Sequence, residues 1–122
     1  MERTILIIED NETFGELTKE AILLESPGTN VKVANSLISA LKLINRHKFD
    51  MIVTDCRVGP ASDFKFITGL WETYHCVALT NYPGHPALKA ATIPVYDKIA
   101  NFEEFLNYTQ SFLAGYKTNR TG

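Results

Sequence analysis

Short apolar runs alternate along the chain with longer segments in which apolar residues recur at helical spacing. The run at residues 4–8 is continuous and rich in β-branched residues, which is typical of a strand buried on both faces. Four further strand-like segments lie at residues 31–33, 49–54, 76–80 and 93–96. The pattern therefore predicts five short strands, separated by segments long enough for helices.

Five helices are predicted between and after these strands. The first covers residues 13–24 and is opened by a capping box of Thr13 and Glu16. The apolar stripes expected to face the core are Phe14, Leu17, Ala21 and Leu24 in the first helix, Leu37, Ala40, Leu41 and Ile44 in the second, Ile67, Leu70, Trp71 and Tyr74 in the third, and Phe102, Phe105, Leu106, Thr109, Phe112 and Tyr116 in the fifth. A second capping box, Asn101 with Glu104, begins the fifth helix.

The fourth helix is expected to be reduced. Pro83, Gly84 and Pro86 disfavour a helix before Ala87, so one or two turns within residues 86–92 are predicted. With five strand and helix alternations in one small domain, the fold class is α/β: a flavodoxin-like three-layer sandwich with a five-stranded parallel sheet, helices on both faces and a shortened fourth helix. Residues 1–116 form the domain, and residues 117–122 are a polar tail.

Composition narrows the functional classes. The chain has 122 residues and a net charge of −2, and its twelve Lys and Arg residues are scattered, so direct nucleic-acid binding is not expected. No apolar run is long enough to span a membrane, and Met1 is followed at once by charged residues, so neither a membrane segment nor a signal peptide is expected. With only two cysteines, and no CxxC spacing, a reducing cytoplasm fits best.

Polar side chains follow four of the five predicted strands. Glu9 and Asp10 follow the first, Asp55 the third, Thr80 ends the fourth, and Lys98 lies just past the fifth. In parallel α/β sheets, ligands bind beyond the carboxyl ends of the strands, so we expect these side chains to meet. Three converging carboxylates repel one another unless a cation lies among them, and their hard oxygen atoms suit Mg²⁺.

A carboxylate in this setting can also be a nucleophile toward a phosphoryl group. The metal and Lys98 would neutralise charge on the phosphoryl oxygens, and the Thr80 hydroxyl would donate a hydrogen bond to one of them. Thr80 would thereby couple the modification to movement of the loop after the fourth strand. The sequence thus predicts a phosphorylation switch.

The sequence at this point resembles the receiver domains of response regulators, which act in bacterial-type two-component signalling. The resemblance covers about residues 3–116, through four segments in a characteristic order: Ile-Leu-Ile-Ile-Glu-Asp-Asn at 5–11, Asp-Met-Ile-Val-Thr-Asp at 50–55, Ala-Leu-Thr at 78–80 and Asp-Lys at 97–98. The resemblance implies that Asp55 accepts the phosphoryl group, that Thr80 is the switch hydroxyl and that Lys98 is the conserved-type lysine of the family.

The resemblance also implies a metal set and partners. Mg²⁺ would be bound by Glu9, Asp10, Asp55 and the backbone carbonyl of Arg57. The phosphoryl group would come from the phosphohistidine of a sensor histidine kinase or phosphotransfer protein, and a downstream protein target would receive the signal. Such a domain is not an enzyme in the ordinary sense, although it promotes its own phosphorylation and dephosphorylation.

Several positions near the site depart from the family pattern. Asn81 stands where a small residue is usual, Ile99 where Pro is usual, and Val95 where the switch aromatic is usual, while Tyr96 lies one position later and would point to the opposite side of the strand. Tyr96 is therefore either a displaced switch aromatic or a packing residue. These departures leave open a receiver-like interaction module that works without phosphorylation.

Two further alternatives concern chemistry and assembly. A small Mg²⁺-dependent aspartyl-phosphate phosphatase would need Asp-x-Asp after the first strand, and Glu9-Asp10-Asn11 differs from that motif. With a reduced fourth helix, the aromatic-rich last helix at residues 101–116 is the expected surface for partner or homodimer contacts.

Overall fold

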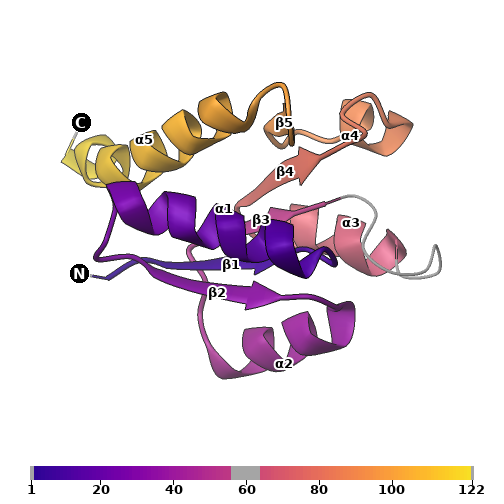
Figure 1. The fold of residues 1–122 in the computed structure, drawn as a ribbon, viewed down its shortest axis with the longest axis horizontal. Helices are drawn as coiled ribbons and strands as arrows, with labels where there is room; N and C mark the ends of the chain where they lie inside the picture. Colours follow the sequence, from indigo (N-terminus) through magenta and orange to yellow (C-terminus); the bar gives the residue numbers. More distant parts are fainter. Residues whose placement is uncertain (1, 56–63, 122) are drawn as a thin grey trace.

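The computed structural model describes residues 2–55 and 64–121, and these form a sheet of five parallel strands between two layers of helices (Figure 1). The elements in chain order are β1 (Thr4–Ile8), α1 (Glu12–Glu25), β2 (Asn30–Ala34), α2 (Leu37–Arg46), β3 (Met51–Thr54), α3 (Phe64–Thr73), β4 (Cys76–Thr80), α4 (Pro86–Ala90), β5 (Val95–Asp97) and α5 (Phe102–Thr121). The predicted fold class is confirmed, including the shortened fourth helix.

The strand order is β2-β1-β3-β4-β5, and every pairing is parallel. The order reverses at β1, whose two neighbours are β2 and β3. The carboxyl ends of β1 and β3 therefore lie side by side, with Ile8 opposite Thr54 in the register. This is the position in an open α/β sheet where connections diverge to opposite faces and leave room for a ligand.

Alternate strand residues build two separate cores. Ile5, Ile7, Met51 and Val53 face α1 and α5, where they pack around the fully buried Phe105. Their strand neighbours Leu6, Ile8 and Ile52 face the opposite way and pack with residues of α2 and α3. Because all of these strand residues are buried, the strands read as continuous apolar runs, as a parallel sheet covered on both faces requires.

α1 docks on the sheet through a face that matches the predicted one only in part, since Phe14 packs against the core as predicted. Its buried residues are Gly15, Thr18 and Ile22, whereas Leu17 and Leu24 are 50% and 84% exposed. Burial of Thr18 is tolerated because its hydroxyl donates to the carbonyl of Phe14 at 2.8 Å. The prediction was wrong for Leu17 and Leu24, because apolar residues occur on more than one side of this helix.

The start of α1 also differs from the prediction. Its N-cap is Asn11, whose side-chain oxygen accepts a hydrogen bond from the amide of Phe14 at 2.9 Å, so Thr13 lies inside the helix. The helix therefore begins at Glu12, two residues after the predicted metal ligand Asp10.

The stripe predicted for α5 agrees with the structure at the positions whose side chains are described. Phe105 and Thr109 are fully buried, and Phe102, Leu106 and Phe112 are partly buried against the same core. α5 continues through residues 117–121, which were predicted to belong to a polar tail. In the part of the chain that the structure describes, no helix is long and apolar enough to cross a membrane.

Candidate functional site at the carboxyl edge of the sheet

Lys98 joins two of the predicted site carboxylates. Its Nζ lies 2.6 Å from Oε1 of Glu9 and 3.0 Å from Oδ2 of Asp55. All three side chains are nearly buried, with exposed fractions of 9%, 4% and 6% for Lys98, Glu9 and Asp55. Charges withdrawn this far from water must be paired, and one ammonium group here satisfies two carboxylates.

Backbone hydrogen bonds set the position of Lys98. Its amide donates to the carbonyl of Thr80 at 3.0 Å, which continues the pairing of β5 with β4 past the end of the strand. The preceding residue, Asp97, accepts from the amides of Ile99 and Ala100 at 2.8 and 2.9 Å. These two hydrogen bonds lower the pKa of Asp97 and close the turn that follows Lys98.

Hydrogen bonds also fix the position of Glu9. Its amide donates to the carbonyl of Ala34, its own carbonyl accepts from the side-chain amide of Asn35, and its Oε2 accepts from the amide of Asn11. These contacts tie the end of β1 to the end of β2 and to the start of α1. The Glu9 carboxylate is therefore preorganised toward Lys98.

Burial controls the electrostatics of this group. It raises the pKa of Glu9, because the hydrogen bonds from Lys98 and the Asn11 amide offset only part of the lost hydration, and the nearby Asp55 raises that pKa further. Burial alone would lower the pKa of Lys98, but its hydrogen bonds to Glu9 and Asp55 outweigh that effect and raise it. Lys98 is therefore a cation at neutral pH.

An aromatic ring completes the surroundings of the ammonium group. Nζ of Lys98 lies 4.9 Å from the centroid of the Phe14 ring, in the first turn of α1. The edge of Phe14 in turn meets Phe102 of α5, with ring centroids 5.8 Å apart. The sequence pattern assigned Phe14 to the core but did not predict its contact with Lys98. The two residues are far apart in the chain, and only the tertiary fold brings them together.

A pocket of about 280 Å³ opens beside these residues at the carboxyl edge of the sheet. Its lining consists of Glu9, Asp10, Asn11, Asp55, Asn81, Tyr82 and Lys98. The predicted set of Glu9, Asp10, Asp55 and Lys98 is therefore gathered around one opening. Asn11, Asn81 and Tyr82 were not predicted as site residues, although Asn11 carries a recognisable signal as an N-cap residue three positions before Phe14.

The acidic residues do not have equal places in this pocket. Glu9 and Asp55 are buried and share Lys98, whereas Asp10 is exposed. Within residues 2–55 and 64–121, no three acidic, His or Cys side chains are grouped as a metal centre. The donor chemistry of the pocket still fits a hard cation, because its three acidic side chains all offer carboxylate oxygens. Arg57, the fourth predicted ligand, lies outside the described residues.

The two predicted switch residues lie on opposite sides of the β4 and β5 pair. Thr80 is fully buried, and its Oγ1 accepts a hydrogen bond from the amide of Tyr82 at 3.0 Å. Tyr96 packs toward α5, with ring centroids 6.3 Å from Phe105 and 6.0 Å from Tyr108. Val95 packs instead in the small cluster around Ala78 and Leu88, on the α4 side.

Comparison with known proteins finds likeness at the level of structure. No protein-family model and no curated protein sequence matches the chain. The signal receiver domain of a DNA-binding response regulator from Colwellia psychrerythraea superposes with a TM-score of 0.78 at 18% identity, over 91% of this chain and 98% of that one. The chemotaxis response regulator CheY4 of Vibrio cholerae gives a TM-score of 0.71 at 19% identity, over 90% and 98%.

A third solved structure contains a metal ion. The response regulator TrrA of Thermotoga maritima, in complex with Mg²⁺ and BeF, superposes with a TM-score of 0.70 at 22% identity, over 89% of this chain and 97% of that one. At these identities the likeness establishes the fold alone. The fold is that of response regulator receiver domains.

Proposed function

We propose that the chain is a response regulator receiver domain of a bacterial-type two-component pathway, with Asp55 as the phosphoryl acceptor. One observation carries the proposal: the Lys98 ammonium lies 3.0 Å from Asp55 and 2.6 Å from Glu9, beside an open pocket at the point where the strand order reverses. A carboxylate with a fixed cation beside it is suited to carry a phosphoryl group. Lys98, Glu9 and Asp55 are nearly buried, unlike an ion pair at the protein surface.

In the proposed reaction, a carboxylate oxygen of Asp55 attacks the phosphorus atom of a phosphohistidine. The new phosphorus–oxygen bond forms as the phosphorus–nitrogen bond breaks, and the leaving imidazole nitrogen keeps the electron pair and takes up a proton. The product is an acyl phosphate on Asp55. Lys98 offsets the added negative charge, since its ammonium group already lies against this carboxylate.

The carboxylates of Glu9, Asp10 and Asp55, with the backbone carbonyl of Arg57, would hold Mg²⁺. When bound, Mg²⁺ supplies positive charge to the phosphoryl oxygens. Burial of Glu9 keeps its carboxylate turned into the pocket, and the hydrogen bond that its Oε2 accepts from Asn11 fixes its orientation. Asp10, which is exposed in the same pocket, remains accessible to a hydrated ion.

Thr80 would report the phosphorylated state. Its hydroxyl oxygen accepts from the Tyr82 amide, and in the phosphorylated state the hydroxyl would donate to a phosphoryl oxygen. A shift of Thr80 toward that oxygen would pull on Tyr82, which lines the same pocket. Tyr96, packed against Phe105 and Tyr108, is proposed to carry part of the change to α5.

The proposed partners follow from this chemistry. A sensor histidine kinase or phosphotransfer protein would donate the phosphoryl group, and a downstream protein target would bind the switched surface. With α4 reduced to Pro86–Ala90, α5 is the proposed surface for that target or for a second copy of the chain. Direct nucleic-acid binding is not part of the proposal.

The test is incubation with Mg²⁺ and acetyl phosphate, followed by intact mass measurement. The wild-type chain should gain the mass of one phosphoryl group, and Asp55→Asn should not. Asp50→Asn is the matched control, because Asp50 precedes β3 and Asp55 follows it, so the same chemical change is made at the opposite end of one strand. Loss of labelling in both variants, or in neither, would count against Asp55 as acceptor.

One alternative has structural support. Asn81 and Tyr82 line the pocket, and Asn81 stands where the family usually has a small residue. Ile99, which follows Lys98 and is 87% exposed, stands where the family usually has a proline. These features favour a receiver-like interaction module that works without phosphorylation. A folded wild-type chain that gains no mass with any small phosphodonor would favour that function instead.

A further inference from the structure

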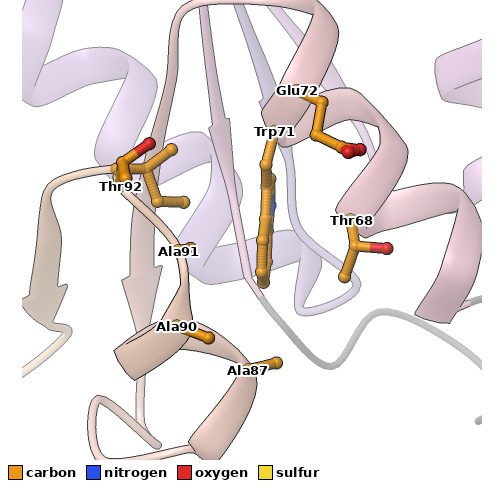
Figure 2. A pocket seen from close by; sticks show the side chains of 8 residues that line it. Thr68, Trp71, Glu72, Ala87, Ala90, Ala91 and Thr92 are labelled. Atoms are coloured by element: carbon orange, nitrogen blue, oxygen red, sulfur yellow. The ribbon is translucent and has the colours of Figure 1, made fainter.

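A second pocket lies between α3 and the segment that runs from α4 toward β5. It has a volume of about 590 Å³, within the range of pockets that hold ligands or parts of partner proteins. Figure 2 shows the Trp71 ring edge-on, between the alanines of α4 and its C-cap on one side and Thr68 and Glu72 on the other. This pocket is separate from the acidic pocket, since the two share no lining residue.

The short fourth helix creates this pocket. α4 has only five residues, and it contributes Ala87 and Ala90, while Ala91 is its C-cap. Methyl side chains leave the space beside Trp71 open, where longer side chains would fill it. Leu88, which is 3% exposed, packs with Ala78 of β4 and keeps α4 on the sheet.

The indole ring of Trp71 is a fixed wall of the pocket. It packs against the core cluster beneath α2 and α3 and also against the Ala78 and Leu88 cluster. A ring held by two clusters loses little conformational freedom when a ligand binds, which is a property of binding hot spots. Trp71 is the only tryptophan in the chain, so tryptophan fluorescence has a single source, which lines this pocket.

Glu72 gives the pocket a negative charge. It is the one charged side chain among the described residues that line it, and no basic side chain there competes for its carboxylate. A partner group must therefore combine a positive charge with a flat apolar surface that can lie against an indole. The guanidinium group of arginine has both properties, whereas the ammonium group of lysine is compact and strongly hydrated.

We infer that this pocket binds an arginine side chain from a partner protein. The guanidinium would stack on the face of Trp71 that Thr68 and Glu72 border and would pair with Glu72, and a neighbouring residue of the partner would lie over the alanine methyl groups on the other side of the ring. The pocket is much larger than one arginine side chain, whose stem and head need on the order of 150 Å³, so residues that flank the arginine would also enter it. The pocket is already present in the unphosphorylated chain.

The link of this pocket to signalling rests on the proposed function. The chain leaves the acidic pocket at Asn81 and Tyr82 and reaches α4 at Pro86, so one loop connects both sites. A phosphorylation-driven shift of Thr80 would move this loop and thereby the alanine wall. The arginine pocket would then open or close with the state of Asp55.

The test titrates the unphosphorylated chain with the peptide acetyl-Gly-Arg-Gly-amide while Trp71 fluorescence and ¹⁵N-labelled amide shifts are recorded. The arginine peptide should bind roughly fivefold more tightly than the same peptide with citrulline, which has the same shape without the charge. Ala90→Leu should weaken binding by narrowing the pocket beside Trp71, and Glu72→Gln should reduce the affinity for the arginine peptide to that for the citrulline peptide. The exposed residues Ala114 and Glu103 of α5 provide matched controls, Ala114→Leu and Glu103→Gln, which should leave the affinity unchanged.

Several outcomes would overturn the inference. Equal affinity for the citrulline peptide would remove the role of charge, and shifts confined to Glu9, Asp10 and their neighbours would place the peptide in the acidic pocket. Free arginine binding as tightly as the peptide would indicate a small guanidinium ligand instead of a partner protein. None of these results depends on phosphorylation, so failure here is distinct from failure of Asp55 to accept a phosphoryl group.

Discussion

The Nζ of Lys98 lies 2.6 Å from Oε1 of Glu9, and this pair joins the end of β5 to the end of β1 across the two strands between them. Asp55, at the end of β3, meets the same ammonium group. The three residues therefore link the carboxyl ends of three strands. Stability and the proposed chemistry both depend on this junction.

Removal of the Lys98 ammonium group should destabilise the fold. Lys98→Met leaves the buried carboxylates of Glu9 and Asp55 without their shared partner, and loss of one member of a buried pair typically costs about 3–5 kcal/mol. The loss should be smaller at pH 5 than at pH 7, because protonation of a carboxylate relieves the repulsion. Urea unfolding at the two pH values measures this, with Lys89→Met, at an exposed position of α4, as the control. Equal losses of unfolding free energy in Lys98→Met and Lys89→Met would contradict a stabilising role for the buried Lys98 ammonium group.

Glu9 should make stability fall as the pH rises. Burial raises its folded-state pKa above the usual 4.5, so the native state binds this proton more tightly than the unfolded chain does. The associated stability is fully present below the unfolded pKa and is lost as the pH rises through the folded pKa. Relative to Glu9→Gln, the wild-type chain should therefore lose free energy of unfolding from about pH 4.5 upward, as measured by denaturant titration at several pH values. A wild-type chain that gains free energy of unfolding relative to Glu9→Gln as the pH rises would refute the burial effect.

Phe14 should influence Lys98 through its ring face. Phe14→Leu keeps an apolar side chain of similar size but removes the cation–π contact at 4.9 Å, a loss of about 1 kcal/mol. The pKa of Lys98 should fall, because its charged form loses a favourable neighbour. NMR titration of the Lys98 ε-carbon measures the shift. Phe102→Leu, which alters the ring that touches Phe14 but not the ammonium group, should leave that pKa unchanged.

Gly15 allows α1 to lie close to β2. A Cβ at this position would lie 2.9 Å from Cγ1 of Val33, so Gly15→Ala should destabilise the protein by about 1–3 kcal/mol despite the better helix propensity of alanine. Val33→Ala in the same chain should restore part of the loss. Gly69→Ala is the matched control, because nothing lies within 4 Å of a Cβ there and α3 should gain about 0.5–1 kcal/mol. Thermal unfolding of the three variants tests this, and a stabilising Gly15→Ala would be evidence against the close packing.

The architecture could be predicted because a doubly covered parallel sheet leaves a strong pattern. Continuous apolar runs such as residues 4–8 mark buried strands, and a strand order that reverses at β1 brings Glu9 and Asp55 to one edge. The shortened α4 was also predictable, since Pro83, Gly84 and Pro86 prevent an earlier start.

Three features could not be predicted from local pattern. The docking face of α1 depends on the close approach of Gly15 to Val33, and glycine carries no hydropathy signal. The contact of Phe14 with Lys98 joins residues far apart in the chain, so only the folded structure reveals it. The arginine pocket beside Trp71 escaped prediction for the same reason, because it is formed between α3 and α4.

Reductive trapping of the phosphorylated residue tests the central claim most directly. Borohydride reduces an aspartyl phosphate to homoserine, and peptide mass spectrometry then identifies the position. After incubation with Mg²⁺ and a phosphohistidine donor, homoserine should be found at position 55, with Asp10, Asp50 and Asp97 unchanged. Homoserine at another aspartate, or none in a chain shown to be folded, would contradict the assignment of Asp55 as the phosphoryl acceptor.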